Sequence, residues 1–434
     1  MAAKDVKRQR RDEPGERVAA IRNAPAAPGA SVEVSVAVIS RRAADRLRAG
    51  HVWVYSSDVV QIPDDAPHLL PVVDQRGIPL GTALYSAVSE IALRLVSTDH
   101  LLAGEAEWLD LLAARLLAAL ARRQGILSSG DTNACRLVFS EADALPGIII
   151  DKYGDLVTVQ LLTRALDNEA VRIVITKILR ESLDPATIVE RPDARIRELE
   201  QLSVPLDGPP LYTKGEPVMR TLFRLNGLSF HYDAAAGQKT GAFLDQRENY
   251  EAAARYAHGE ALDVCTYQGG FALHLARACP RVTGVDVSRA ALEVAEQNLV
   301  ANRDTLGGSE VDWVEANAFD LLRDWSDSGA VYDTIVLDPP AFAKSKRAVE
   351  GALRGYKELN LRALRMLRPG GILVTCSCSH HVSLADFNAV VASAAGDARR
   401  RVRLLERRGA AVDHPVVLGI PETEYLKCLI CQAE

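Results

Sequence analysis

The stretch A-L-D-V-C-T-Y-Q-G-G-F-A-L-H-L-A at residues 261–276 decides how the second half of this chain folds. A short apolar run passes Asp263, breaks at the adjacent glycines Gly269 and Gly270, and resumes with apolar residues at helical spacing. This order predicts a strand, a tight turn and a helix. Two glycines in such a turn let a ligand approach the bare backbone, or they satisfy a purely steric need of the turn. The G-x-G-x-x-G pattern that holds a pyrophosphate is absent from the stretch, so a dinucleotide site is not predicted.

Beyond this stretch, predicted strands alternate with predicted helices. Ser288, for example, is expected to cap a helix in which Ala291, Val294, Ala295 and Leu299 share one face. Alternation of this kind predicts a parallel, doubly wound α/β sheet, whose ligands bind beyond the carboxyl ends of the strands. The strands are expected at residues 261–264, 281–287, 311–316, 333–338, 371–377 and 424–431.

Polar residues stand at three successive strand ends of this expected sheet. Asp263 with the adjacent glycines resembles motif I of the class I S-adenosylmethionine methyltransferases, whose donor is an amino acid on a nucleoside. Asp286 ends the second strand, near the place where an acidic residue accepts hydrogen bonds from ribose hydroxyls. Asn317 ends the third strand and is expected to hydrogen-bond an adenine amino group. Together these residues predict a nucleoside-binding site.

The fourth expected strand ends in L-D-P-P-A-F at residues 337–342. The two prolines fix the backbone after Asp338 and cannot donate hydrogen bonds, so carbonyl groups are left free to point into the site. Amino-group methyltransferases use a similar acidic-Pro-Pro-aromatic stretch, but here Ala341 separates Pro340 from Phe342.

The fifth expected strand ends in T-C-S-C-S-H-H at residues 375–381. Cytosine carbon 5 is a poor nucleophile, and a thiolate that adds at carbon 6 makes it an enamine able to accept a methyl group. Cys378 lies one pleat beyond Cys376, nearer the edge where ligands collect. The alternative is that both are ordinary buried cysteines. A zinc site with Cys428 and Cys431 is rejected, because residues three apart on a regular strand face opposite sides.

The sequence before this sheet predicts a tail and two smaller domains. Residues 1–30 mix charges with Pro, Ala and Gly and predict a disordered tail. Residues 31–103 contain short strands, a turn at Gly77 and a bulge at Gly81, which predict a small β-barrel. The order of these pieces looks like a PUA domain, an RNA-binding module, although a β-domain that only packs on its neighbour is the alternative.

Residues 104–216 predict an α+β middle domain, and residues 217–434 the sheet domain. The middle domain is expected to begin with a helix at 105–124 and to continue as a three-stranded meander from Cys135. A helix from about Asn168 and further strands near 187–190 and 218–230 follow.

The composition, with 48% hydrophobic and 25% charged residues among 434, is that of an ordinary soluble globular protein. No apolar run reaches the length of a membrane span and no signal-peptide core is present, so a cytoplasmic location is expected. Seven cysteines, an odd number, argue for a reducing compartment. The net charge of −6 does not indicate nucleic-acid binding, but positive charge is clustered at residues 41–48 and 399–408. Each cluster is either a set of phosphate contacts or a solvated face.

After the tail, the chain resembles the RlmI-type large-subunit ribosomal RNA (cytosine-5) methyltransferases along nearly its whole length. The motifs that carry the resemblance are H-V-W-V-Y-S (51–56), S-E-A-D-A-L-P-G-I-I-I-D-K-Y-G-D (140–155), G-Q-K-T-G-A-F-L-D-Q-R-E-N (237–249), D-V-C-T-Y-Q-G-G-F (263–271), L-D-P-P-A-F (337–342), S-C-S (377–379) and D-H-P-V (413–416).

This resemblance implies a PUA domain, a middle domain and a Rossmann-like domain that binds S-adenosylmethionine. It also implies ribosomal RNA of the large subunit as partner. By position it implies that Cys378 is the nucleophile, that Asp338 contacts the base and the cofactor, and that Tyr267 joins the cofactor residues. His380 and His381 have no counterpart in it, and Cys376 is an accessory.

We therefore expect an S-adenosylmethionine-dependent RNA (cytosine-5) methyltransferase without a bound metal. One rival is an amino-directed RNA methyltransferase that uses Asp338, Pro339 and Pro340. Another is a ribosome-assembly factor that binds RNA without turnover, against which the intact glycine pair and Asp286 argue. The oligomeric state is left open, with a homodimer as one option.

Overall fold

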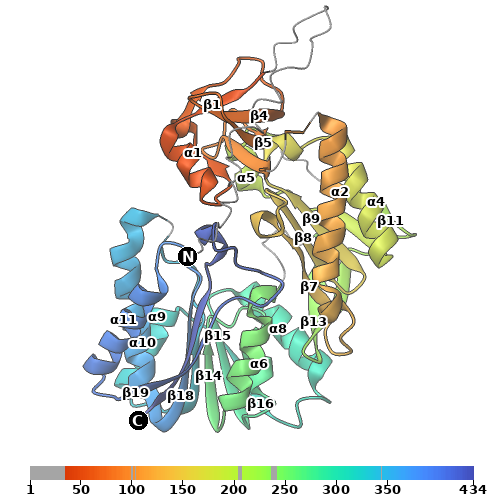
Figure 1. The fold of residues 1–434 in the computed structure, drawn as a ribbon. Helices are drawn as coiled ribbons and strands as arrows, with labels where there is room; N and C mark the ends of the chain where they lie inside the picture. Colours follow the sequence, from red (N-terminus) through yellow and green to blue (C-terminus); the bar gives the residue numbers. More distant parts are fainter. Residues whose placement is uncertain (1–34, 99–100, 103, 204–207, 236–241, 344) are drawn as a thin grey trace, which may run out of the picture. The chain divides into compact units, whose positions relative to one another are not determined.

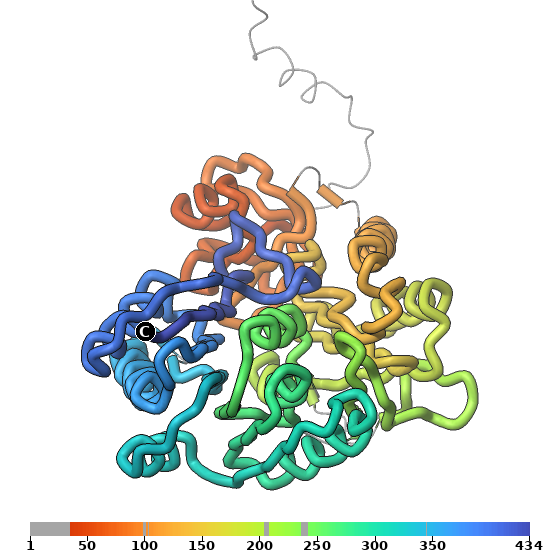
Figure 2. Tube along the Cα trace, turned by 90° about the horizontal axis from the view of Figure 1, so that it is seen from below, coloured from red at the N-terminus to blue at the C-terminus, as the bar shows by residue number. Residues whose placement is uncertain are grey.

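The computed structural model describes residues 35–98, 101–102, 104–203, 208–235, 242–343 and 345–434. The tail predicted at residues 1–30 and the segment 237–241 lie outside this part of the chain. Three larger sheets and one hairpin come from successive stretches of sequence. Figure 2 follows them as a tube from the red N-terminal segments through yellow and green to the blue C-terminus.

The N-terminal sheet has six strands in the order β2-β6-β5-β4-β1-β3, and β1 pairs with β4 in parallel. The bulge predicted at Gly81 is confirmed. The β4–β5 register shifts beside Gly81, its φ is +134°, and a Cβ there would lie 1.9 Å from the Ser97 carbonyl oxygen. The elements are β1 (Ala37–Ile39), α1 (Arg41–Arg48), β2 (Trp53–Val54), β3 (Val59–Gln61), β4 (Leu69–Asp74), β5 (Pro79–Tyr85) and β6 (Leu93–Ser97).

The four arginines of α1 do not all face solvent. Arg46 and Arg48 each form an ion pair, at 2.9 and 2.6 Å, with a buried aspartate of the N-terminal sheet domain. The side chains of Arg41 and Arg42 are 90% and 79% exposed. Arg41 and Arg42 therefore remain the candidates for phosphate contacts on α1. The guanidinium groups of Arg46 and Arg48 are already paired with aspartates of their own domain.

The middle sheet has five strands in the order β11-β10-β9-β8-β7. The predicted meander is confirmed as β7, β8 and β9, and β10 adds to it in parallel. Helices α2 and α4 share an apolar core with this sheet. The elements are α2 (Glu105–Arg122), α3 (Gln124–Leu127), β7 (Ala134–Phe139), β8 (Ile148–Tyr153), β9 (Leu156–Leu161), α4 (Glu169–Leu183), β10 (Thr187–Glu190), α5 (Ala194–Leu199) and β11 (Tyr212–Thr213).

The C-terminal sheet has seven strands in the order β16-β15-β14-β17-β18-β20-β19. The expected parallel α/β arrangement is confirmed for β14 to β18, whereas β20 runs antiparallel to β18 and β19. The strands are β14 (Glu260–Val264), β15 (Arg281–Asp286), β16 (Glu310–Glu315), β17 (Tyr332–Leu337), β18 (Leu367–Ser377), β19 (Val402–Arg408) and β20 (Lys427–Ala433).

The strand β19 was not predicted. The six arginines at residues 399–408, some of which belong to this strand, indicated only a charge cluster. β19 is the edge strand of the sheet, and several of its side chains are exposed. An edge strand tolerates charge on both faces, so the alternation that identifies a half-buried strand is missing.

Helices cover both faces of the C-terminal sheet, as Figure 1 shows. One apolar core joins the sheet to α9, α10 and α11, and another joins it to α6, α7 and α8. The predicted cap of α8 is confirmed, since the Ser288 side chain accepts a hydrogen bond from the Ala291 backbone. The helices are α6 (Arg247–Tyr256), α7 (Gly270–Leu275), α8 (Arg289–Asn302), α9 (Ala318–Asp327), α10 (Val349–Met366) and α11 (Leu384–Asp397).

The strands expected near 218–230 form a hairpin of their own, β12 (Arg220–Leu225) and β13 (Leu228–Asp233), and not a part of the middle sheet. The side chains of Asn298 and Asn302 on α8 accept hydrogen bonds from the β13 backbone at 2.8 and 2.7 Å. The hairpin is thus tied to the C-terminal domain. Among the described residues, no helix has the length and apolarity needed to cross a membrane.

Candidate cofactor and catalytic site

The turn between β14 and α7 is organised by the buried carboxylate of Asp263. Its Oδ2 accepts hydrogen bonds from the Thr266 hydroxyl at 2.5 Å and from the Ala272 backbone at 2.9 Å. Its Oδ1 is also buried and has no hydrogen-bond partner. Burial raises the pKa of Asp263 to about 7. An unpaired buried carboxylate oxygen is costly, so this atom points to a missing donor.

Asp286 at the end of β15 holds the other side of the same turn. One carboxylate oxygen accepts from the Tyr267 backbone and the other from the Ser288 backbone, both at 2.9 Å. Cys265 and Tyr267 have positive φ angles of 65° and 52°, which are unfavourable for residues with side chains. Because Asp286 bonds directly to Tyr267, it stabilises a strained loop of the kind that occurs at binding sites.

The two adjacent glycines serve close packing. A Cβ on Gly270 would lie 2.5 Å from the Tyr250 hydroxyl, and a Cβ on Gly269 would lie 2.9 Å from the Trp313 ring. Gly269 also has a φ of +84°. The space beside both Cα atoms is therefore filled by aromatic side chains, so the turn has a steric need for glycine at both positions, and Gly270 also lines the cavity over the turn.

A small cavity of about 30 Å³ lies over this turn. Its wall is mostly apolar and aromatic, with Asp338 as the one acidic group among the lining residues. Small-molecule sites commonly combine an apolar wall with a few polar groups. The lining residues are Leu225, Phe230, Ala242, Phe243, Tyr250, Cys265, Thr266, Tyr267, Gln268, Gly270, Phe271 and Asp338.

Asn317 lies at the end of β16, where its side chain is exposed and caps α9. Its Oδ1 accepts hydrogen bonds from the Phe319 and Asp320 backbones at 2.9 and 3.4 Å. An adenine amino group would need the same oxygen as acceptor, so it would have to share Asn317 with the helix.

Asp338 follows β17 directly and lies among other acidic groups. Burial, together with the charges of Asp245 and Asp263, raises the pKa of Asp338 to about 8. Gln246 opposes this shift, because its side-chain amide donates to Asp338 Oδ2 at 3.0 Å. The group is therefore mostly neutral at pH 7 until a cation or a donor enters the site.

The two strand-end cysteines differ in depth, as predicted. Cys376 is fully buried inside the sheet, in register with Cys428 of β20. Cys378 is only partly buried, and its Sγ lies 3.9 Å from the Pro339 carbonyl oxygen. Burial, with Asp338 and Asp245 adding to it, raises the pKa of the Cys378 thiol to about 11.

A hydroxyl network fixes the backbone on both sides of Cys378. The Tyr356 hydroxyl on α10 lies 2.9 Å from the side chains of both Ser377 and Ser379. Ser379 Oγ also accepts from the Ala343 backbone at 3.2 Å, which joins this segment to the loop after Pro340. The position of the thiol relative to Asp338 is thus held by buried hydrogen bonds.

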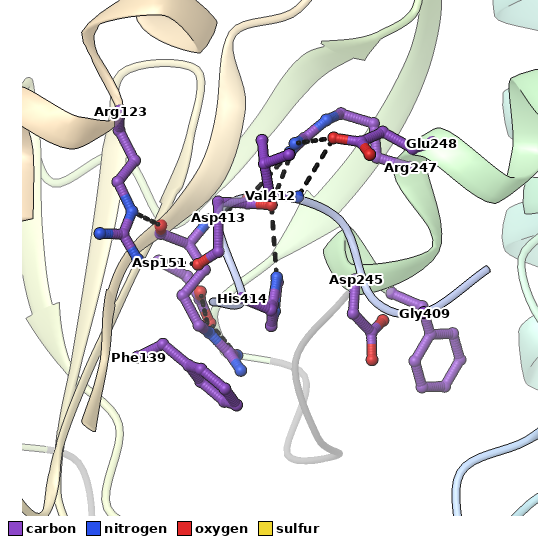
Figure 3. A network of polar contacts seen from close by, with 12 residues as sticks. Arg123, Phe139, Asp151, Asp245, Arg247, Glu248, Gly409, Val412, Asp413 and His414 are labelled. Atoms are coloured by element: carbon purple, nitrogen blue, oxygen red, sulfur yellow. Dashed lines mark hydrogen bonds and ion pairs between the residues drawn. The ribbon is translucent and has the colours of Figure 1, made fainter. Parts of the chain in front are cut away.

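The D-H-P-V segment is fixed by a buried polar network, drawn in Figure 3. Asp413 lies between two arginines: Arg247 of α6 donates to its carboxylate at 2.9 and 3.0 Å, and Arg123 donates to its carbonyl at 2.8 Å. The Arg136 backbone of β7 also donates to Asp413 at 2.8 Å. Burial opposes ionisation, but the hydrogen bond from His414 and the charge of Arg247 hold the pKa of Asp413 below its ordinary value.

Four further residues at this site were not singled out from the sequence: Asp245, Gln246, Tyr425 and Lys427. Asp245 and Gln246 fall within the L-D-Q-R-E-N motif, which indicated a resemblance but no chemical role. The Tyr425 hydroxyl donates to Asp245 at 2.5 Å. The ring of His380 lies 5.4 Å from that of Tyr425, and both His380 and His381 are exposed. Within the described ranges, no group of three or more His, Cys, Asp or Glu residues could hold a metal ion.

Comparisons with known proteins agree with this geometry. The family model of S-adenosylmethionine-dependent methyltransferases matches residues 185–417, and that of the PUA-like domain matches residues 38–98. The chain is 38% identical over 392 residues to the ribosomal RNA large subunit methyltransferase I of Shewanella denitrificans, covering 89% of this chain and 96% of the relative. It is 36% identical to the protein of the same name from Photobacterium profundum, with the same coverage.

A solved methyltransferase structure complexed with SAH has the same fold, with a TM-score of 0.77. The alignment covers 92% of this chain and all of the other, at 20% identity.

Proposed function

The chain belongs to the family of S-adenosylmethionine-dependent methyltransferases that includes the ribosomal RNA large subunit methyltransferases I, and from this membership we propose that it methylates carbon 5 of a cytosine in large-subunit ribosomal RNA. The observation that carries the proposal is the difference in depth between the two cysteines. Cys378 is accessible at the carboxyl edge beside Asp338, whereas Cys376 is fully buried.

S-adenosylmethionine is the family's cofactor, and the residues of the turn fit it. The unpaired Oδ1 of Asp263 and the raised pKa of Asp338 both indicate that the site lacks a cationic donor. An ammonium group supplies both a hydrogen-bond donor and a positive charge, and a sulfonium supplies the charge alone. We assign the cofactor to the following residues: Asp263, Tyr267, Gly269, Gly270, Asp286, Asn317 and Asp338.

The proposed chemistry uses Cys378 as nucleophile. The thiol loses its proton, and the thiolate adds to carbon 6 of the cytosine, which makes carbon 5 nucleophilic. S-adenosylmethionine, when bound, supplies the methyl group that carbon 5 accepts. The carbon-5 proton then leaves, and the carbon 6–sulfur bond breaks to release Cys378 as thiolate. Asp338 contacts the base, and its carboxylate oxygens can accept hydrogen bonds from the N–H groups of the base.

The substrate cytosine has to be accessible, because a base inside a duplex is stacked and paired. Enzymes that react with a base act on single strands or flip the base out. We therefore propose that the target lies in a loop or is extruded, and that the PUA-like domain contributes RNA affinity.

The test uses large-subunit ribosomal RNA transcribed with 5-fluorocytidine. Fluorine cannot leave as the carbon-5 proton does, so the covalent protein–RNA adduct should survive denaturation. Cys378→Ala should lose both adduct and turnover, and the matched variant Cys376→Ala should keep most of each. An adduct that persists in Cys378→Ala and vanishes in Cys376→Ala would reverse the assignment.

A second candidate is amino-directed methylation. The observation that favours it is the Pro339 carbonyl oxygen, which lies 3.9 Å from the Cys378 sulfur. That carbonyl could accept from an exocyclic amine in place of the thiol. Turnover that survives in both cysteine variants, with the methyl group found on the exocyclic amine by nucleoside mass spectrometry, would establish this candidate. Absence of any turnover with intact RNA binding would favour an assembly factor.

A further inference from the structure

Lys427 is a lysine buried at the first position of β20, only 5% exposed. In the antiparallel register of β18 and β20 it lies opposite Ser377. Its Nζ donates hydrogen bonds to the carbonyl oxygens of Ser379 and Tyr425, both at 2.7 Å. Lys427 thus contacts the residues on either side of Cys378, one through strand pairing and the other through its ammonium group.

The Lys427 ammonium has no ordinary counter-ion. Among the residues that the structure describes, no carboxylate lies within 4.0 Å of its nitrogen. The two carbonyls use two of its three N–H groups. Burial lowers the pKa of Lys427 to about 8, and the charge of Cys378 is the largest influence that opposes this. A buried charge without a partner is expensive, which suggests that the anion it serves is formed during the reaction.

We infer that Lys427 is the positioning residue that stabilises the Cys378 thiolate. The thiol proton leaves to solvent, the ammonium keeps its own protons, and the sulfur becomes an anion on the residue next to Ser379, whose carbonyl Lys427 binds. The effect of Lys427 on catalysis rests on the cysteine mechanism proposed above. The effect of Lys427 on the ionisation of the Cys378 thiol is independent of that mechanism.

The other charges around the thiol do not supply this function. Asp338 and Asp245 raise the pKa of Cys378, and Lys427 is the cation that lowers it. The remaining titratable groups that act on Cys378 or Lys427 are Tyr356, Tyr425, His380 and Glu424. Without Lys427, the neighbouring carboxylates should therefore disfavour ionisation of the Cys378 thiol.

The experiment measures alkylation of Cys378 by iodoacetamide as a function of pH, followed by peptide mass spectrometry on the full chain. Only the thiolate reacts, so each unit by which the pKa rises slows the reaction about tenfold at a fixed pH below that pKa. We expect Lys427→Met to slow Cys378 alkylation about tenfold and Lys427→Arg to restore most of the rate. Lys357→Met, which removes a half-buried lysine of α10 that pairs with Asp397 at 2.7 Å, should match the wild type.

A purely structural role for Lys427 makes a different prediction. If folded Lys427→Met alkylates at the wild-type rate and with the wild-type pH profile, the lysine only ties β20 to the loop and the inference is overturned. Should that variant fail to fold, Lys427→Gln decides, since its amide can still donate to a carbonyl but carries no charge. A wild-type pH profile in Lys427→Gln would overturn the inference equally.

The 5-fluorocytidine adduct separates this inference from the proposed function. A wild-type protein that forms no adduct contradicts the cysteine mechanism, whereas the alkylation profile of Cys378 still tests Lys427. If the adduct forms, it should form more slowly in Lys427→Met and recover in Lys427→Arg.

Discussion

Asp338 and Asp263 are carboxyl groups in an environment that disfavours their ionised form. Their pKa values are raised to about 8 and about 7, with burial as the first cause in both. Neighbouring carboxylates add to the effect: Asp245 for Asp338, and Asp286 for Asp263. An opposite charge nearby reverses such a shift, because it favours the ionised carboxylate. The site is therefore suited to a cationic ligand such as S-adenosylmethionine.

We expect the binding of S-adenosylmethionine to release protons at pH 7, because Asp338, whose pKa is about 8, ionises as the cation arrives. In the free protein Asp338 is protonated when the pH is below this pKa. The affinity for S-adenosylmethionine should therefore rise with pH up to about 8 and then level off. Calorimetry in buffers of different ionisation enthalpy measures the protons released. Asp338→Asn should release fewer and show a flatter pH dependence. Equal proton release by the variant and the wild type would contradict this account.

At the scale of elements, the turn from β14 to α7 depends on contacts between distant segments. Tyr250 of α6 packs against Gly270 and Phe271, and its ring lies at 90° to that of Phe271 with centroids 4.7 Å apart. Tyr250 and Phe271 also line the cavity over the turn. The start of α7 is therefore placed by α6, and the cavity depends on that contact.

Gly270→Ala should disturb this contact, because the added Cβ would lie 2.5 Å from the Tyr250 hydroxyl. Overpacking of this kind costs about 1–3 kcal/mol of unfolding free energy. Weaker binding of S-adenosylmethionine should accompany it. The matched control is Gly351→Ala in α10, where the nearest atom is 3.8 Å away on the flexible Arg354 side chain. There we expect a gain of about 0.5–1 kcal/mol from helix propensity. Chemical denaturation that shows equal effects at both positions would refute the packing argument.

The alternation of strands and helices from β14 to β18 could be predicted from the sequence, because each buried parallel strand is a short apolar run with a polar residue at its end. The edge strand β19 could not, since its charged side chains hide the period. The antiparallel insertion of β20 between β18 and β19 is a tertiary choice that local patterns do not encode.

The same limit explains which site residues were found. Cys378 and Asp338 end parallel strands, where the fold class itself predicts ligands. Lys427 and Tyr425 approach Cys378 only because β20 returns antiparallel beside β18. Asp245 reaches the site through its bond with Tyr425. Contacts of this kind depend on register between distant segments, which spacing along the chain does not give.

At the scale of the whole molecule, buried charges join the middle and C-terminal domains. Asp413 receives donors from Arg123 and Arg136 of the middle domain and from Arg247 of α6. Arg123 in turn binds both oxygens of Asp143 at 2.6 and 2.7 Å. Such a network contributes little net stability, but removal of one member leaves an uncompensated buried charge. It therefore favours one arrangement of the segment that leads from Asp413 into Tyr425 and Lys427.

RNA binding is a property of the whole chain, and its salt dependence tests the role of the PUA-like domain. Phosphate contacts release counterions, so the logarithm of affinity falls with the logarithm of salt concentration by about 0.7 to 0.9 per contact. Arg41 and Arg42 are exposed on α1, and Arg42 lies 3.9 Å from Asp58, whereas Arg46 is mostly covered and pairs with Asp58 at 2.9 Å. We expect the double variant Arg41→Gln, Arg42→Gln to bind large-subunit ribosomal RNA more weakly and to flatten that slope by about 1.4 to 1.8.

Filter binding at several salt concentrations measures this slope. Arg354→Gln serves as control, because Arg354 is an exposed arginine on α10 that pairs with Glu350 at 2.6 Å. A general effect of net charge would lower affinity in the control as well, roughly in proportion to the charge removed. A specific contact surface on α1 predicts that only the double variant changes the slope, while its alkylation of Cys378 and its affinity for S-adenosylmethionine stay at wild-type values. An unchanged slope in the double variant would mean that the RNA phosphates meet another part of the chain, and that the N-terminal sheet serves only to pack against its neighbours.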